Sequence, residues 1–128
     1  MGFRVIRPDD AVWEDRPNQE GKLRRAADVT SAGELTQSRA RIWRYPAHTR
    51  GRRHAEGAQE EVFVVLEGRI TLALGEPPEM VEVAAGGFAS VATGTEIQVR
   101  NESEAEAVML IWGAPAVTGQ SEILDDLR

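Results

Sequence analysis

The chain has 128 residues, of which 41% are hydrophobic, and a formal net charge of −6. This length fits one domain with a single core, and the hydrophobic content is too high for a disordered chain. The acidic balance argues against a broad nucleic-acid surface, which needs an excess of lysine and arginine. Because the chain contains no cysteine, disulfides and thiolate chemistry are excluded.

Targeting and membrane signals are also missing from the sequence. No apolar run approaches the roughly 20 residues that cross a bilayer. The first residues, MGFRVIRPDD, lack the apolar centre of a secretory signal. These features predict a cytoplasmic protein without nucleic-acid or membrane partners.

The first 37 residues are polar and mixed in charge, and we expect them to form an N-terminal arm with strands. This arm is predicted to pack on the rest of the chain or on a partner subunit. The stretch RPNQEGK (16–22) is typical of a turn. The stretch ADVTSAGEL (27–35) is compatible with a short helical turn and with a loop.

From residue 38 to residue 115 the sequence predicts one β domain. Short apolar segments separated by glycine, proline and charged turns recur along it: SRARIWRY, EVFVVL, RITLALG, MVEVA, FASVA, EIQVR and AVMLIW. About seven or eight short strands with turns every 8–12 residues indicate an all-β sandwich or barrel. Glu67 and Gly68 are expected to form a tight hairpin between two strands. The tail, residues 116–128, could form one helical turn.

Both faces of the segment EVFVVL are apolar. Alternation places Glu61, Phe63 and Val65 on one face of the strand, and the other face carries only valine and leucine. Such a face needs cover, because a solvated sheet normally alternates apolar with polar side chains. We expect it to pack on the N-terminal arm or on a second subunit, which makes a homodimer the predicted assembly.

The spacing of His54, Glu56, Glu61 and Gly68 resembles the first motif of the cupin superfamily, and the small single-domain "cupin 2" conserved-barrel proteins in particular. The family has a second histidine at the position of Glu56. The other three positions keep the family residue.

The spacing of Gly94, Ile97 and Asn101 matches the second cupin motif, in which Ala92 replaces a proline and Ile97 replaces a histidine. The resemblance covers residues 38–115. It implies a jelly-roll, double-stranded β-helix barrel, usually paired through its outer sheet and N-terminal strand.

In typical cupins the two motifs supply three histidines and one glutamate to a divalent ion. Here the resemblance implies a degenerate site of His54, Glu56 and Glu61, since Ile97 cannot ligate. One imidazole and two carboxylates form a hard, oxygen-rich set that suits Mn, Mg or Ca and can accept Zn or Fe. The expected cofactor is therefore none, or a weakly bound Mn, Fe, Ni or Zn ion. The alternative is a metal-free cluster in which a carboxylate activates His54 as a base.

The inward register adds Phe63 and Ile97 to the pocket, as an apolar wall opposite the polar end formed by His54, Glu56 and Glu61. His48 is expected to lie too far away to join them. It would be roughly 20 Å from His54 in a continuous strand.

Other candidates are more often structural. Trp43 and Trp112 are expected to pack, and Glu60 is expected to be a solvated edge residue. The four arginines between residues 44 and 53 either balance nearby glutamates in a loop or hold an anionic ligand at the pocket mouth.

The sequence thus predicts a small-molecule-binding cupin barrel with a weakened or absent metal site. It leaves three alternatives open: a metal-dependent oxygenase or isomerase using His54, Glu56 and Glu61, a metal-free isomerase with His54 as base, and a purely structural module. It indicates no substrate and no reaction, so it does not decide whether the protein is an enzyme.

Overall fold

The computed structural model describes residues 2–117 and 121–127. Its elements in chain order are the 3-10 turn η1 (Pro8–Asp10), β1 (Trp13–Pro17), β2 (Leu23–Asp28), α1 (Val29–Gly33), β3 (Arg39–Tyr45), β4 (Thr49–Arg50), β5 (His54–Glu56), β6 (Glu60–Glu67), β7 (Arg69–Leu74), β8 (Glu79–Ala84), β9 (Phe88–Val91), β10 (Glu96–Asn101), β11 (Ala107–Ala114) and β12 (Ser121–Ile123).

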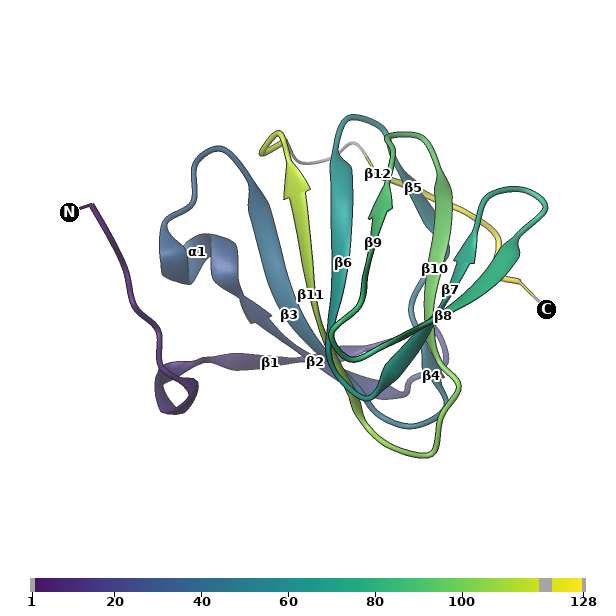
Figure 1. The fold of residues 1–128 in the computed structure, drawn as a ribbon, viewed down its shortest axis with the longest axis horizontal. Helices are drawn as coiled ribbons and strands as arrows, with labels where there is room; N and C mark the ends of the chain where they lie inside the picture. The colour runs from purple at the N-terminus through teal and green to yellow at the C-terminus, as the bar shows by residue number, and fades with distance from the viewer. Residues whose placement is uncertain (1, 118–120, 128) are drawn as a thin grey trace.

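The strands form two antiparallel sheets that face each other across the barrel (Figure 1). Within the described ranges, the first sheet has six strands in the order β1-β2-β3-β11-β6-β9. The second has five in the order β12-β5-β10-β7-β8 and a sixth strand, β4, that pairs with β10; the name six-stranded sheet is kept for the first. This architecture confirms the predicted all-β jelly roll.

The N-terminal region contributes β1 and β2 to the first sheet and also forms α1. The predicted turn at residues 16–22 is present, and Asn18 holds it to the barrel: its side chain accepts from the amide of Lys22 and donates to the carbonyl of Arg50, both at 2.8 Å. Asp28 caps the N-terminus of α1 by accepting from the amide of Ser31. Of the helical turn and the loop that the sequence left open, the structure therefore has the short helix, which this cap stabilises.

The expected hairpin at Glu67-Gly68 is wrong. β6 pairs with β11 and β9, whereas β7 pairs with β10 and β8. A single residue, Gly68, therefore carries the chain from one sheet to the other. Its φ is +70°, and a Cβ atom would lie 2.8 Å from the carbonyl oxygen of Glu106, so only glycine fits this crossing.

The helical turn expected in the tail is also wrong for the described part of the tail. Ser121–Ile123 is a strand that pairs with β5, and Ser121 lies opposite Glu56 while Ile123 lies opposite His54. The physical reason is the free edge of β5, whose backbone donors and acceptors need partners. Residues 118–120 and 128 lie outside the described residues.

The core fills the space between the two sheets. Its members are aliphatic or aromatic side chains from both sheets that are almost fully buried: Tyr45, Phe63, Val65, Ile70, Leu72, Val91, Ile97, Val99, Ala107 and Met109. Glu61, Phe63 and Val65 all point inward, as the alternation predicted.

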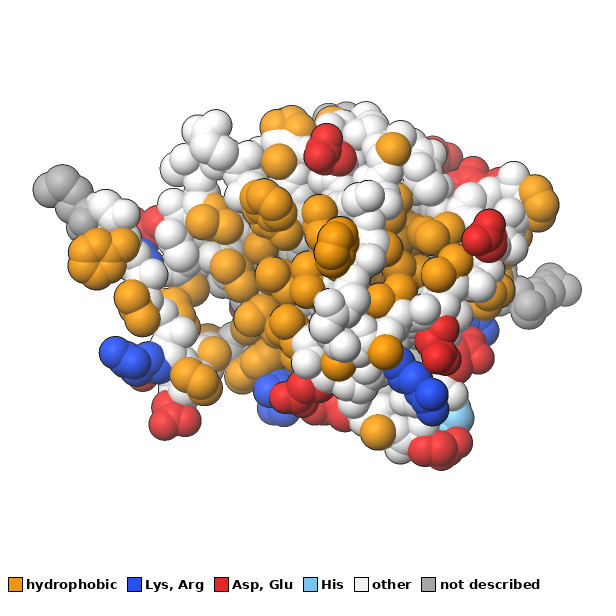
Figure 2. All heavy atoms as spheres, viewed as in Figure 1, with side chains coloured by type: hydrophobic (Ala, Val, Ile, Leu, Met, Phe, Trp, Pro, Cys, Tyr) orange, Lys and Arg blue, Asp and Glu red, His pale blue; other side chains and the backbone are white. Residues whose placement is uncertain are grey.

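The outer face of the six-stranded sheet is apolar. One row of neighbouring residues crosses all six strands: Trp13, Ala27, Ile42, Leu110, Val64 and Phe88. Figure 2 shows hydrophobic side chains gathered over this part of the molecule. Phe88 is 70% exposed and Trp112 47% exposed, and Phe3 in the N-terminal arm is 79% exposed. The described part of the arm therefore leaves much of this face uncovered.

Among the described residues, no helix is both long and apolar enough to span a membrane.

Candidate functional site

A cavity of about 530 Å³ opens at one end of the barrel. Its wall combines the inner face of the six-stranded sheet with β5 and β12 of the other sheet, and a side of α1. Small-molecule sites in β-barrels commonly occupy this position, at the mouth of the barrel.

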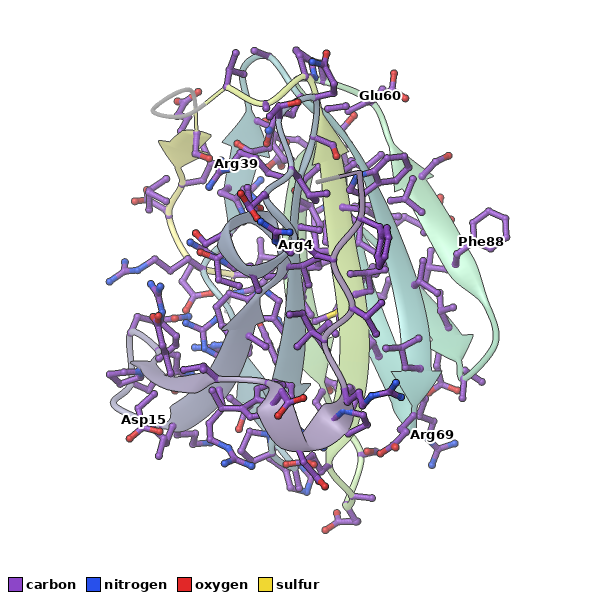
Figure 3. The ribbon with its side chains drawn as sticks, turned by 90° about the vertical axis from the view of Figure 1, so that its left-hand side faces the viewer. Arg4, Asp15, Arg39, Glu60, Arg69 and Phe88 are labelled. Atoms are coloured by element: carbon purple, nitrogen blue, oxygen red, sulfur yellow. The ribbon has the colours of Figure 1, made fainter. Side chains whose placement is uncertain are left out.

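The inner face of the six-stranded sheet changes from charged to apolar with depth. Successive rows across β3, β11 and β6 are Arg39–Gly113–Glu61, Arg41–Ile111–Phe63 and Trp43–Met109–Val65. Figure 3 shows Arg39 toward the same end of the barrel as Glu60, and away from Asp15 and Arg69. The charged row thus lies toward the end of the barrel that carries Glu60.

Gly113 makes room in that row. A Cβ atom at Gly113 would lie 3.4 Å from Cγ of Glu61 and 3.2 Å from the carbonyl oxygen of Glu60. Because glycine has no side chain, Arg39 and Glu61 can both turn toward the cavity from the strands on either side.

The three predicted polar residues lie together at this mouth. His54 and Glu56 are separated by one residue on β5, so both point to the same side, and Glu61 faces them from β6. Each offers a ligand atom within 4.8 Å of the other two. The distance between Nε2 of His54 and Oε1 of Glu61 is 4.0 Å.

Neighbouring groups orient two members of this triad. Nδ1 of His54 lies 3.2 Å from the carbonyl oxygen of Arg52. Since a carbonyl only accepts, Nδ1 carries a hydrogen. In the neutral ring the lone pair then lies on Nε2, the nitrogen that is 4.0 Å from Glu61. Glu56 accepts a hydrogen bond from the hydroxyl of Ser121 on β12.

Glu61 sits in an environment that opposes its negative charge. Burial raises its pKa to about 7, and the neighbouring carboxylate of Glu56 adds to this, while Arg39 acts in the opposite direction. A carboxyl group with this pKa can accept or release a proton near neutral pH.

The donor set fits a divalent cation with a small contraction. Ligands about 2.1 Å from a metal ion lie at most about 4.2 Å apart, and the atoms of the triad span up to 4.8 Å. The lone pair on His54 and its bond to a backbone carbonyl are the arrangement expected of a metal-ligating histidine. The triad therefore suits a hard ion, with fewer nitrogen donors than a three-histidine site.

The two residues predicted for the apolar wall lie in different places. Phe63 lines the cavity, but Ile97 does not. Ile97 does lie directly opposite His54, on β10, yet its side chain is 1% exposed and belongs to the core. The apolar wall is formed by Phe63, Ile111 and Val99 instead.

Sequence reasoning missed the contribution of β3. Trp43, expected to pack, lines the cavity together with Arg39, Arg41 and Tyr45. The signal was present in the alternation of SRARIWRY, which puts these residues on one face. It does not reveal whether that face meets solid core or a cavity.

The arginines between residues 44 and 53 mostly form ion pairs outside the cavity. Arg44 pairs with Glu106, Arg50 with Asp126 and Glu20, and Arg53 with Glu76 and Glu96. Within this group, Arg52 lines the cavity.

The two remaining predictions concern His48 and Glu60. His48 is exposed and lies 2.8 Å from Glu104, outside the cavity. Glu60 is exposed at the start of β6, as expected.

With this geometry in place, the comparison with protein families is informative. A family model described as "Cupin domain" matches residues 41–113. The chain belongs to the Cupin_2 family. No curated protein matches this cupin in sequence.

Many solved structures share the fold of this cupin. A sugar phosphate isomerase of the cupin superfamily from Silicibacter pomeroyi has a TM-score of 0.79 at 21% identity, over 95% of this chain and 82% of that chain. The polyketide cyclase RemF from Streptomyces resistomycificus has a TM-score of 0.78 at 16% identity, over 97% and 87%. A predicted oxalate decarboxylase from Thermotoga maritima has a TM-score of 0.76 at 16% identity, over 87% and 98%. At such identities the likeness establishes the fold alone.

Proposed function

We propose that this cupin binds a small organic molecule in its cavity, with the polar end of the ligand at His54, Glu56 and Glu61. The observation that carries the proposal is the convergence of these three groups within 4.8 Å at the mouth of a 530 Å³ cavity. The apolar wall below them supplies a surface for the carbon skeleton of the ligand.

The same triad is proposed as a weak site for a divalent ion such as Mn²⁺. When bound, the ion would polarise an oxygen atom of the ligand. Two carboxylates favour a hard ion, and the hydrocarbon side chain of Ile97 beside His54 replaces a fourth ligand, which lowers affinity for later transition metals.

A second candidate is a metal-free isomerase, in which His54 and Glu61 move a proton on the ligand. It is favoured by the pKa of Glu61, which burial raises to about 7. It is also favoured by the contact of Nδ1 of His54 with the Arg52 carbonyl, which places the lone pair of the neutral imidazole on Nε2. Two structures of the same fold carry sugar phosphate isomerase in their descriptions, from Silicibacter pomeroyi and Acidithiobacillus ferrooxidans, which supports isomerisation as the reaction class.

A metal titration tests the proposed ion site. We expect chelator-treated protein to gain thermal stability when Mn²⁺ is added, and Glu61→Ala to lose this gain. Glu60→Ala is the matched control, because Glu60 is the adjacent residue on β6 and is exposed. An equal gain in wild type and Glu61→Ala would place the ion elsewhere and contradict the proposal.

The ligand itself is tested separately. Native mass spectrometry of protein purified without chelator should show a small organic molecule that is reduced in Phe63→Trp, which fills the cavity. A mass that is unchanged by this variant would contradict binding in the cavity.

A further inference from the structure

The cavity wall is richer in positive charge than the rest of the molecule. Among the described residues of the wall, four arginines accompany three carboxylates, although the chain has 21 acidic against 15 basic side chains. The arginines are Arg24, Arg39, Arg41 and Arg52. Cations gathered around one cavity of an acidic protein favour anions over neutral molecules at that place.

Arg39 and Arg41 lie beside the triad on the inner face of the six-stranded sheet. They are separated by one residue on β3, so both point to the inner face, in the row of Glu61 and the row of Phe63 respectively. Both side chains are half-buried and line the cavity.

Among the described residues, no direct ion pair neutralises either arginine, although Arg39 lies near enough to Glu61 to lower the pKa of that carboxyl. Burial, followed by the positive charge of Arg16, lowers the pKa of Arg41, and Arg39 adds to this effect. Asp28 and Glu14 offset only part of it. A guanidinium that is partly buried among other positive charges is stabilised by a bound anion.

The acid opposite Arg41 in the sheet already accepts two hydrogen bonds from another residue. Asp28 lies opposite Arg41 in the β2–β3 register, but its carboxylate accepts from the amide of Ser31 at 3.2 Å and from the hydroxyl of Ser31 at 3.0 Å. Within the described ranges of the chain, neither Arg39 nor Arg41 forms an ion pair.

Other arginines of the molecule behave differently. Arg44, on the opposite face of the same strand, pairs with Glu106 at 2.9 Å. Arg53, whose side chain is 10% exposed, pairs with Glu76 at 2.6 Å. Arg44 and Arg53 therefore have direct carboxylate partners. Arg39 and Arg41 share the cavity with three carboxylates but, among the described residues, form no ion pair with them.

We infer that Arg39 and Arg41 form an anion subsite that takes the carboxylate or phosphate group of an organic ligand. The planar fork of a guanidinium matches the oxygens of both groups. This inference rests on the proposed ligand-binding role of the cavity and narrows the ligand to acids and phosphate esters.

The position of the subsite also limits the size of the ligand. Arg39 and Glu61 lie two strands apart, on either side of Gly113, which corresponds to about 10 Å between their Cα atoms. Both side chains reach inward, which shortens the gap between their charged ends. The acid group and the atoms that face the triad therefore belong to one compact molecule.

Calorimetric titration with inorganic phosphate and, separately, with malonate tests the subsite and distinguishes the two anion classes. The protein is first treated with chelator, so that no metal ion takes part. We expect at least one anion to bind, Arg41→Gln and Arg39→Gln to weaken it roughly ten- to hundredfold, and Arg44→Gln to leave it unchanged. Sorbitol, a neutral polyol, should not compete. Binding of neither anion, or equal loss in Arg44→Gln, overturns the inference.

Chemical labelling tests the subsite without a substitution that could unfold the protein. Phenylglyoxal modifies accessible arginines, and peptide mass spectrometry locates the label. We expect the bound anion to protect Arg39 and Arg41 from labelling but not the exposed Arg69. If the anion leaves the labelling of Arg39 and Arg41 unchanged, the inference is contradicted. If the anion protects the two arginines but Mn²⁺ does not bind, the anion subsite is supported and the proposed ion site is contradicted. If Mn²⁺ binds but the anion gives no protection, the ion site is supported and the anion subsite is contradicted.

Discussion

The two faces of the six-stranded sheet use the same strands for different purposes. On β3, Arg39, Arg41 and Trp43 point into the cavity, whereas Ile42 belongs to the apolar outer row and Arg44 pairs with Glu106 at the surface. The inner face is thus charged at its mouth and apolar in depth, and the outer face is apolar and partly uncovered. Period-two alternation lets one strand serve a ligand on one side and a protein surface on the other.

We propose that a second copy of the chain covers the outer face. Trp112 and Phe88 are exposed on this face, and Phe3 is exposed in the arm that precedes β1. Both the sheet and the arm therefore offer apolar surface. Monomeric proteins rarely expose such contiguous patches without a partner. The homodimer expected from the sequence thus remains a prediction, with a defined surface.

The largest difference between the faces should appear in stability. Phe63→Ala removes a ring that is 2% exposed in the core, and we expect a loss of about 3–5 kcal/mol in the free energy of unfolding. Leu66→Ala, on the outward face of the same strand and 46% exposed, should lose about 1 kcal/mol. Urea denaturation monitored by circular dichroism measures both, and equal losses would contradict the inward register.

The second effect concerns the charge of Glu61. Its carboxyl has an ordinary pKa of 4.5 when unfolded and about 7 in the folded protein. Below both values each state carries the proton. Above both values the folded state must hold a buried charge. Stability should therefore fall between pH 4.5 and 7, by up to about 3 kcal/mol.

Unfolding of metal-free protein at several pH values checks this dependence. Glu61→Gln should remove the decline between pH 4.5 and 7, whereas Glu60→Gln should retain it. A decline of equal size in Glu61→Gln would assign it to other groups.

The third effect tests the outer face. Trp112→Glu places a charge on the apolar outer face, opposite Val62. We expect dimer affinity to fall by about 2 kcal/mol or more, since central aromatic residues carry much of an interface. Light scattering coupled to size exclusion reports the mass. A wild-type monomer at high protein concentration would contradict the proposed dimer, and Glu122→Gln on β12 serves as a control for surface charge.

The smallest effect concerns the missing nitrogen donor. Because Ile97 lies opposite His54, Ile97→His should strengthen binding of Ni²⁺ or Zn²⁺ by about tenfold, measured by metal titration. Ile97→Leu is the control for the altered core. Unchanged affinity in Ile97→His would show that residue 97 cannot turn toward the triad.

Most of the fold can be predicted from the sequence, because the alternation of apolar and polar residues and the turn residues between segments indicate where the strands lie. The inward set Glu61, Phe63 and Val65 and the short strands from residue 38 onward follow from periodicity alone. The crossing at Gly68 does not, because a glycine between two apolar segments is equally typical of a hairpin. The strand at Ser121–Ile123 was missed because its residues are exposed and show no apolar pattern.

The candidate site could be predicted only in part. Motif spacing brought His54, Glu56 and Glu61 together, because spacing fixes which strand positions face each other. The arginines of β3 and the burial of Ile97 depend on how the two sheets leave a cavity between them. That volume is a property of packing, which no local pattern encodes.

The placement of the three tryptophans allows intrinsic fluorescence to report on the two faces of the sheet. Trp43 stands in the cavity wall, with the guanidinium of Arg24 over its ring at 4.8 Å from the centroid, whereas Trp112 sits on the outer face. Ligand entry would thus alter the emission of Trp43, and subunit association that of Trp112. Two variants that lack Trp13 and either Trp43 or Trp112 would each keep one tryptophan and would report one of the two events by fluorescence.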